Sequence, residues 1–233
     1  MRGLHRILMP VCLFGGALAL GFAQSVISAR SGLINHFEGE VFLNEEALVR
    51  NPLRLVHMDP YDVVRAGATG RAEILVTPEA FLRVRQRGSV RLLSDSVAAP
   101  RFELLSGSMI LEVQEAPKGT NIGLVWKQFE IAVSKRTIFR LDSSTGNLMV
   151  IDGEVNVEGA GAKAKAGRGR LIALNKDMAI GKFDRNLGDA FDHWSARRSQ
   201  TLARTNLRNT RTNRDPRQRG RFQNFRVSRP GEP

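Results

Sequence analysis

Residues 148–157 have the sequence LMVIDGEVNV, in which the pair Asp152-Gly153 separates two runs of β-forming residues. An Asp-Gly pair in this setting favours a type I′ turn, because both central residues of that turn need a positive φ. In the run after the pair, Val155 and Val157 share one face, since strand side chains alternate. The stretch therefore predicts a β-hairpin with one apolar face.

The same alternation extends outward from this stretch, from Gly32 to about Ile180. Short alternating runs separated by Gly, Pro, Asp and Asn indicate strands, and no stretch there keeps a helical period of about 3.6 residues for three turns. The candidate strands are residues 40–44, 72–77, 81–86, 90–93, 109–113, 129–134, 137–142, 148–151, 154–158 and 171–174. The sequence therefore predicts an all-β domain.

A glycine followed by alternating apolar residues recurs at Gly39, Gly107 and Gly153. Recurrence of this kind indicates stacked, similar β units. The spacings of 68 and 46 residues are unequal, so a strict repeat is not supported. A twisted, solenoid-like domain and a β-sandwich both remain open.

The first 23 residues have the layout of a secretory signal peptide. Arg2 and Arg6 precede an apolar run over residues 7–22, and small residues stand at its end at Gly21 and Ala23. We therefore expect residues 1–23 to be a cleaved signal peptide and the mature chain to be periplasmic or secreted. An uncleaved membrane anchor is the alternative, although the run is shorter than the roughly 20 residues of a spanning helix. The single cysteine, Cys12, lies in this segment, so no disulfide is expected.

The net charge of +12 is concentrated near the C-terminus. Residues 24–190 hold 22 Lys and Arg against 20 Asp and Glu, a net charge of +2, whereas residues 191–233 hold 11 Arg against 3 acidic residues, a net charge of +8. We therefore expect a nearly neutral β-domain over residues 24–182, a short docking helix within 183–208 and a disordered Arg-rich tail over 209–233.

A change of pattern after Lys182 predicts the helix. Asp189 can accept hydrogen bonds from the free amides of a helix start, and helix formers continue to about Leu207. Four apolar residues fall on roughly one face, which predicts that the helix docks on the β-domain. These residues are Leu187, Phe191, Trp194 and Leu202.

Three arginines of the predicted β-domain are candidate binding residues for an anion or an acidic partner. Arg83, Arg85 and Arg87 alternate, so on one strand they would project from the same face at a spacing of about 6–7 Å. The alternative is a solvated strand face on which these arginines pair with glutamates of neighbouring strands. The candidate glutamates are Glu103, Glu112 and Glu130.

The tail supplies the second group of candidate binding residues, which are Arg211, Arg214, Arg217, Arg219 and Arg221. In an exported protein the available anions are lipid headgroups, lipopolysaccharide phosphates and acidic proteins. An envelope protein, an anionic envelope polymer or a membrane surface is therefore the expected partner, and nucleic acid is less favoured. The alternative is a solubilising tail without a specific partner.

The residues available for chemistry argue against an enzyme. His5, His36, His57 and His193 are scattered, and the sequence has no Gly-x-Ser-x-Gly motif. Residues 159–170, GAGAKAKAGRGR, lack the Gly-Lys-Ser/Thr ending of a phosphate loop, so a flexible basic loop between strands is predicted. We therefore expect no catalytic residues, no cofactor and no metal ion.

The β-region resembles the FecR domain, the periplasmic domain named after the ferric-citrate regulator. The segment VVRAGATGRAEIL at residues 63–75 resembles the family's turn that leads into a strand. Further matching pieces follow in order at residues 81–84, 89–92, 104–108, 111–113, 137–141, 152–157 and 166–168. The resemblance covers about residues 30–180, and residues 191–194 resemble a helix that follows this domain in some exported relatives.

The resemblance implies a β-rich, solenoid-like fold and, in the founding regulators, the relay of a receptor signal to a sigma factor. That relay needs a cytoplasmic domain, and six residues precede the apolar run here. We therefore expect a non-catalytic exported module for sensing, binding or scaffolding at the bacterial cell envelope. One alternative is a structural surface component that self-associates through β-edges and is anchored by its basic tail. Another is a secreted nucleic-acid-binding protein.

Overall fold

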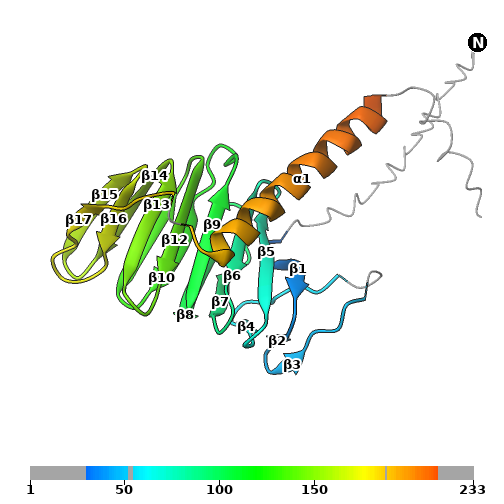
Figure 1. The fold of residues 1–233 in the computed structure, drawn as a ribbon, viewed down its shortest axis with the longest axis horizontal. Helices are drawn as coiled ribbons and strands as arrows, with labels where there is room; N and C mark the ends of the chain where they lie inside the picture. The colour runs from blue at the N-terminus through cyan, green and yellow to red at the C-terminus, as the bar shows by residue number, and fades with distance from the viewer. Residues whose placement is uncertain (1–29, 52–54, 187, 215–233) are drawn as a thin grey trace, which may run out of the picture.

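The computed structural model describes residues 30–51, 55–186 and 188–214. In these ranges the chain forms two β-sheets and one helix, which confirms the predicted all-β class with a C-terminal helix (Figure 1). The sheets face each other as two layers and do not close into a barrel. Of the two architectures that the sequence left open, the sandwich describes this arrangement better.

The chain passes repeatedly between the sheets, usually after forming two strands in one of them. The eight-stranded sheet has the order β1 (Leu33–Glu38), β5 (Arg71–Thr77), β6 (Ala80–Val84), β9 (Ser108–Val113), β12 (Thr137–Asp142), β13 (Asn147–Asp152), β16 (Arg170–Ala173) and β17 (Ile180–Lys182). The nine-stranded sheet has the order β15 (Ala162–Gly167), β14 (Glu154–Gly159), β11 (Phe129–Val133), β10 (Ile122–Trp126), β8 (Arg101–Ser106), β7 (Ser89–Ser94), β4 (Val63–Ala66), β2 (Val41–Leu43) and β3 (Glu46–Ala47).

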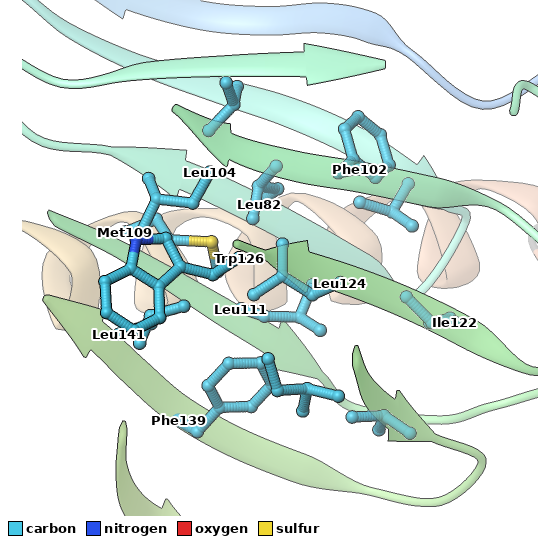
Figure 2. Close-up of a cluster of buried hydrophobic side chains, with 14 of the residues drawn as sticks. Leu82, Phe102, Leu104, Met109, Leu111, Ile122, Leu124, Trp126, Phe139 and Leu141 are labelled. Carbon is cyan, nitrogen blue, oxygen red and sulfur yellow. The ribbon is translucent and has the colours of Figure 1, made fainter. Parts of the chain in front are cut away.

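The hydrophobic core fills the space between the sheets. Leu82, Leu111 and Phe139 of the eight-stranded sheet meet Phe102 and Leu124 of the nine-stranded sheet (Figure 2). The longer strands contribute alternate residues to this core, because successive strand side chains point to opposite faces. The alternation predicted from the sequence is therefore the pattern that holds the two layers together.

The hairpin predicted at Asp152-Gly153 is wrong. Strand β13 belongs to the eight-stranded sheet and β14 to the nine-stranded sheet, so the two flanking runs do not pair with each other. Gly153 has a positive φ of 76°, but Asp152 is not among the residues with positive φ, as a type I′ turn would require. A Cβ at position 153 would lie 2.2 Å from the carbonyl oxygen of Arg136, so glycine lets the chain turn sharply between the sheets.

The recurring glycines mark this kind of corner. Gly39 (φ 62°) and Gly107 (φ 75°) also stand where the chain leaves one sheet for the other. Two-residue turns with positive φ at both positions occur instead at Asn44-Glu45 and at Ala160-Gly161. These turns join β2 to β3 and β14 to β15. The recurrence therefore indicates repeated crossings between layers.

Residues 159–170 are not the flexible loop that the sequence predicted. Residues 162–167 form β15, which pairs antiparallel with β14. On this strand Lys163 bonds to Glu158 at 2.9 Å and Lys165 bonds to Glu154 at 2.8 Å. Alternating Ala and Lys have low β-propensity, so the strand depends on its cross-strand partners.

Helix α1 (Ala190–Arg214) lies across the outer face of the eight-stranded sheet and extends beyond it (Figure 1). The side-chain Oδ1 of Asp189 accepts hydrogen bonds from the amides of Phe191 (2.8 Å) and Asp192 (3.1 Å), which confirms the predicted N-cap. The predicted end near Leu207 is wrong, because the helix continues to Arg214. Leu187 and the tail after residue 214 lie outside the described residues.

Candidate binding groove beside helix α1

The outer face of the eight-stranded sheet is unusually rich in buried side chains. Glu73 on β5, Arg83 on β6 and Glu112 on β9 all point away from the core, because their strand neighbours point into it. On an uncovered sheet these positions would face water. Here α1 covers them, so this face combines apolar contacts with buried charge.

The apolar contact is made by the first turns of α1. Phe191 and Trp194 are buried and stacked with ring centroids 5.9 Å apart, and they pack with Ile110 of β9 and Ile138 of β12. The guanidinium of Arg140 lies 5.8 Å from the centroid of the Phe191 ring. Docking of α1 therefore rests on an aromatic pair that covers two isoleucines on the sheet.

Arg83 is the centre of a buried charged cluster beneath α1. Its side chain is 0% exposed, and its Nε donates to Glu73 at 2.9 Å. Its Nη1 donates to Glu112 and, at 2.8 Å, to the hydroxyl of Ser195 on α1. Glu73 also accepts from Arg198 of α1 at 2.7 Å. These five residues form the Arg83 cluster, in which the helix and three strands share two carboxylates and two guanidiniums.

A second cluster, centred on Arg140 of β12, holds the start of the helix. Arg140 donates to Asp192 at 2.7 Å, lies 3.0 Å from Asp189 and bonds to Ser108 at 3.0 Å. Arg85 donates to the same Asp189 carboxylate at 2.6 Å. The carboxylate that caps the helix therefore also binds two arginines of the sheet, which fixes where α1 begins.

The structure does not bring Arg83, Arg85 and Arg87 together on one open face. Arg83 is enclosed, Arg85 is half-buried against Asp189, and Arg87 is exposed after the end of β6 with a positive φ of 58°. Arg83 pairs with Glu112, as the alternative interpretation of the sequence predicted. A role for these arginines in binding an external anion remains a prediction.

The tail arginines cannot be placed in a site. Arg211 and Arg214 lie in the last turns of α1, and their side chains are outside the described part of the chain. Arg217, Arg219 and Arg221 lie wholly outside the described residues. Their proposed binding of anions therefore also stays a prediction.

Both clusters lower the pKa of a carboxyl group. Burial is the largest single influence and raises the pKa of Glu73, but the hydrogen bond from Arg198 and the charge and hydrogen bond of Arg83 outweigh it, so the pKa lies below the ordinary 4.5. Burial likewise raises the pKa of Asp189. The hydrogen bond and charge of Arg140, with bonds from backbone amides, bring it well below 3.8. Both groups are therefore ionised at neutral pH.

We expect the docking of α1 to weaken in acid. The pKa values of Glu73 and Asp189 in the folded chain lie below the ordinary values that these groups have in the unfolded chain. Their contribution to the free energy of unfolding is therefore fully present above the unfolded values and is lost as the pH falls through the folded values. Urea unfolding between about pH 7 and pH 2, followed by Trp194 fluorescence in a Trp126→Phe background, measures this loss.

Two variants make this test specific. Asp189→Asn keeps a side chain that can cap the helix but has no charge to lose, so its stability should fall less steeply in acid. Glu154→Gln removes an exposed partner of Lys165 and should leave the acid dependence unchanged. A free energy of unfolding that does not change over the acid range would contradict the prediction.

A groove of about 480 Å³ opens beside the docked helix. Its floor is apolar and consists of Ile110, Ile138, Met149 and Ile151, on the outward positions of β9, β12 and β13. One wall is the face of α1 formed by Asp192, Ser195, Ala196 and Ser199, in which Ser195 and Ala196 each lie three or four residues from both Asp192 and Ser199. Phe183, Asp184, Arg185 and Gly188, which precede the helix, form the other wall.

The groove can hold apolar side chains, and two carboxylates of its lining are held by hydrogen-bond donors. Glu112, at its edge, accepts hydrogen bonds from Arg83, Ser199 and Gln114. Asp189 is bound by two arginines and two amides. The lowered pKa of Asp189 makes this carboxylate a poor general base, because its negative charge is already stabilised.

The groove was not predicted from the sequence, although the sequence contains a pattern that indicates it. Residues 148–151 are apolar without interruption, and residues 109–111 are as well. A strand that is apolar on both sides is covered on both faces. These runs therefore indicate a second covered surface outside the core, which is where α1 and the groove lie.

The described residues contain neither a metal-binding cluster nor a membrane-spanning helix. In residues 30–51, 55–186 and 188–214, no group of three or more His, Cys, Asp or Glu side chains could hold a metal ion. The same ranges contain no helix with the length and hydropathy needed to cross a membrane.

Comparison with known proteins yields a partial structural likeness. No protein-family model matches the chain, and no curated protein sequence matches it. Two crystal structures of a "putative anti-sigma factor" from Parabacteroides distasonis ATCC 8503, at 1.65 Å and 2.50 Å resolution, are similar with a TM-score of 0.44 and 13% sequence identity. The match covers 52% of this chain and 59% of the other, so this chain spans less than two thirds of its solved neighbours.

Proposed function

We propose that this chain is an exported, non-catalytic module of FecR type that binds a segment of a partner protein at the bacterial cell envelope. The observation that carries the proposal is the groove beside α1, with its floor of four apolar side chains. Its volume of about 480 Å³ is within the range of established binding pockets, roughly 300–1,000 Å³. The ordered segments that resemble the FecR domain support a sensing role rather than a purely structural one.

The rigidity of the groove favours binding over simple packing. Its helical wall is held by the Arg83 and Arg140 clusters, and its floor belongs to a continuous sheet. A preformed apolar groove loses little conformational entropy when it binds a ligand. The expected partner segment is therefore short and apolar, with polar groups that remain at the mouth of the groove.

The alternative of self-association through β-edges is less well supported. Strand β15 is an edge strand of the nine-stranded sheet, and Lys163 and Lys165 project from it. Lysines on an edge strand oppose the pairing of that edge with another chain. We therefore do not propose self-assembly through the β15 edge.

Selection of a displayed random-peptide library on the full chain tests the proposal. We expect enriched peptides with clustered apolar residues, and these should lose at least about tenfold in affinity (about 1.4 kcal/mol) when Ile151→Trp fills the groove. The matched control is Ala132→Trp, on the outward face of the nine-stranded sheet, which should bind as the unmodified chain does. Failure to enrich peptides, or equal binding to both variants, would overturn the proposal.

A further inference from the structure

The groove beside α1 has a candidate occupant in the chain itself. Beyond Arg214 the sequence continues for 19 residues, DPRQRGRFQNFRVSRPGEP. Its large apolar residues are Phe222, Phe225 and Val227, and arginines flank the two phenylalanines at Arg221 and Arg226. Apolar anchors beside basic residues suit a groove with an apolar floor and a carboxylate at its mouth.

The length of the chain allows this segment to return to the groove. Ser199 is the last groove residue on α1, and 15 further residues of helix span about 22 Å. Residues 215–222, when extended, span up to about 27 Å, which is enough to bring Phe222 back to Ser199. Phe225 then reaches farther along the same groove.

The mouth of the groove offers a partner for the arginines. Asp184 is exposed, and its carboxylate caps the amide of Asn186 at 2.9 Å. Within the described ranges it takes part in no salt bridge, unlike Asp189 and Asp192, which bind Arg140. An arginine next to a seated phenylalanine would therefore meet a carboxylate that no other cation holds.

We propose that residues 217–229 bind back into the groove beside α1 of the same chain, with Phe222 and Phe225 on the apolar floor and a flanking arginine at Asp184. This inference rests on the proposed function, since it assigns a resident occupant to the same groove. A partner segment must displace the tail before it can bind. The bound tail therefore raises the concentration of partner that is needed to occupy the groove.

Disulfide trapping in the full chain tests the placement. With Cys12→Ser, the introduced pair Met149→Cys and Asn224→Cys supplies the two thiols, and both phenylalanines remain. We expect an intramolecular disulfide to form at least about tenfold faster than in the matched control pair Ala132→Cys and Asn224→Cys, because a bound tail raises the local thiol concentration. Adding Phe222→Ser and Phe225→Ser should abolish the difference.

The possible outcomes separate this proposal from the proposed function. Equal trapping rates for the two pairs would overturn it, and disulfide-linked dimers would assign the groove to the tail of a second copy and overturn it as well. If the tail binds, peptides selected on the groove should bind the Phe222→Ser, Phe225→Ser chain about tenfold more tightly, as expected when an occupant at a millimolar effective concentration is removed. If peptides bind the groove but the tail is not trapped faster, the proposed function is supported and only the binding of the tail is contradicted.

Discussion

Replacement of Arg83 by methionine is expected to lower the free energy of unfolding by about 3–5 kcal/mol, because it leaves the carboxylates of Glu73 and Glu112 without their shared cation. Arg83 is fully buried and binds both carboxylates. Arg198 still reaches Glu73, but Glu112 keeps only neutral partners, Ser199 and Gln114. Urea unfolding followed by near-ultraviolet circular dichroism measures the loss.

Two controls isolate the charge from the packing. Arg91→Met removes an arginine whose side chain is 37% exposed and is paired with Glu103, so the expected cost is at most about 1 kcal/mol. Adding Glu73→Gln and Glu112→Gln to Arg83→Met removes the stranded charges and should restore most of the stability. A cost for Arg83→Met as small as that for Arg91→Met would contradict the assignment of a buried charged cluster.

The sequence predicts many of the strands because strand side chains alternate locally, although it misses β1, β4, β8 and β10. Val155 and Val157 are buried, while Glu154 and Glu158 on the same strand are exposed, as the pattern indicates. Burial of every second residue follows from the pleat of a single strand and needs no knowledge of its partners. The all-β class could therefore be predicted without the rest of the fold.

Pairing between strands is not local, and here the sequence prediction fails. Asp152-Gly153 has the residues of a hairpin turn, but the carbonyl oxygen of Arg136, in the connection between β11 and β12, approaches Gly153 and shapes a corner. Nothing within residues 148–157 separates these outcomes, because both need a glycine with positive φ. Which sheet each run joins is decided by neighbours such as β11 and β16.

The candidate site was hidden from the sequence for the same reason. Arg83 and Ser195 are 112 residues apart, and the helix that buries the arginine begins at Ala190. Alternation places Arg83 outside the core, and only the docked helix turns this outer face into an interior. Pairing with Glu112 could be foreseen because strand neighbours are few, whereas the contributions of Arg198 and Ser195 could not.

The docking of α1 can be tested at its aromatic contact. Phe191→Ala should lower the free energy of unfolding by about 3–5 kcal/mol, as expected for a fully buried phenylalanine. Phe191 is 1% exposed, and its removal leaves a cavity beside Trp194 and Ile110. Urea unfolding reports the stability, and Trp194 emission in a Trp126→Phe background reports whether the helix remains on the sheet.

Thr205→Ala on the part of α1 beyond the aromatic contact is the matched control. Thr205 is exposed and its hydroxyl bonds to the carbonyl of Thr201, so the expected change is within about 0.5 kcal/mol. Equal costs for the two substitutions would mean that α1 is not held by its first turns. If Phe191→Ala frees the helix, it also removes one wall of the groove, so peptide binding and tail trapping should be lost together. Loss of stability with both kinds of binding intact would show that the floor, rather than the helix, makes the site.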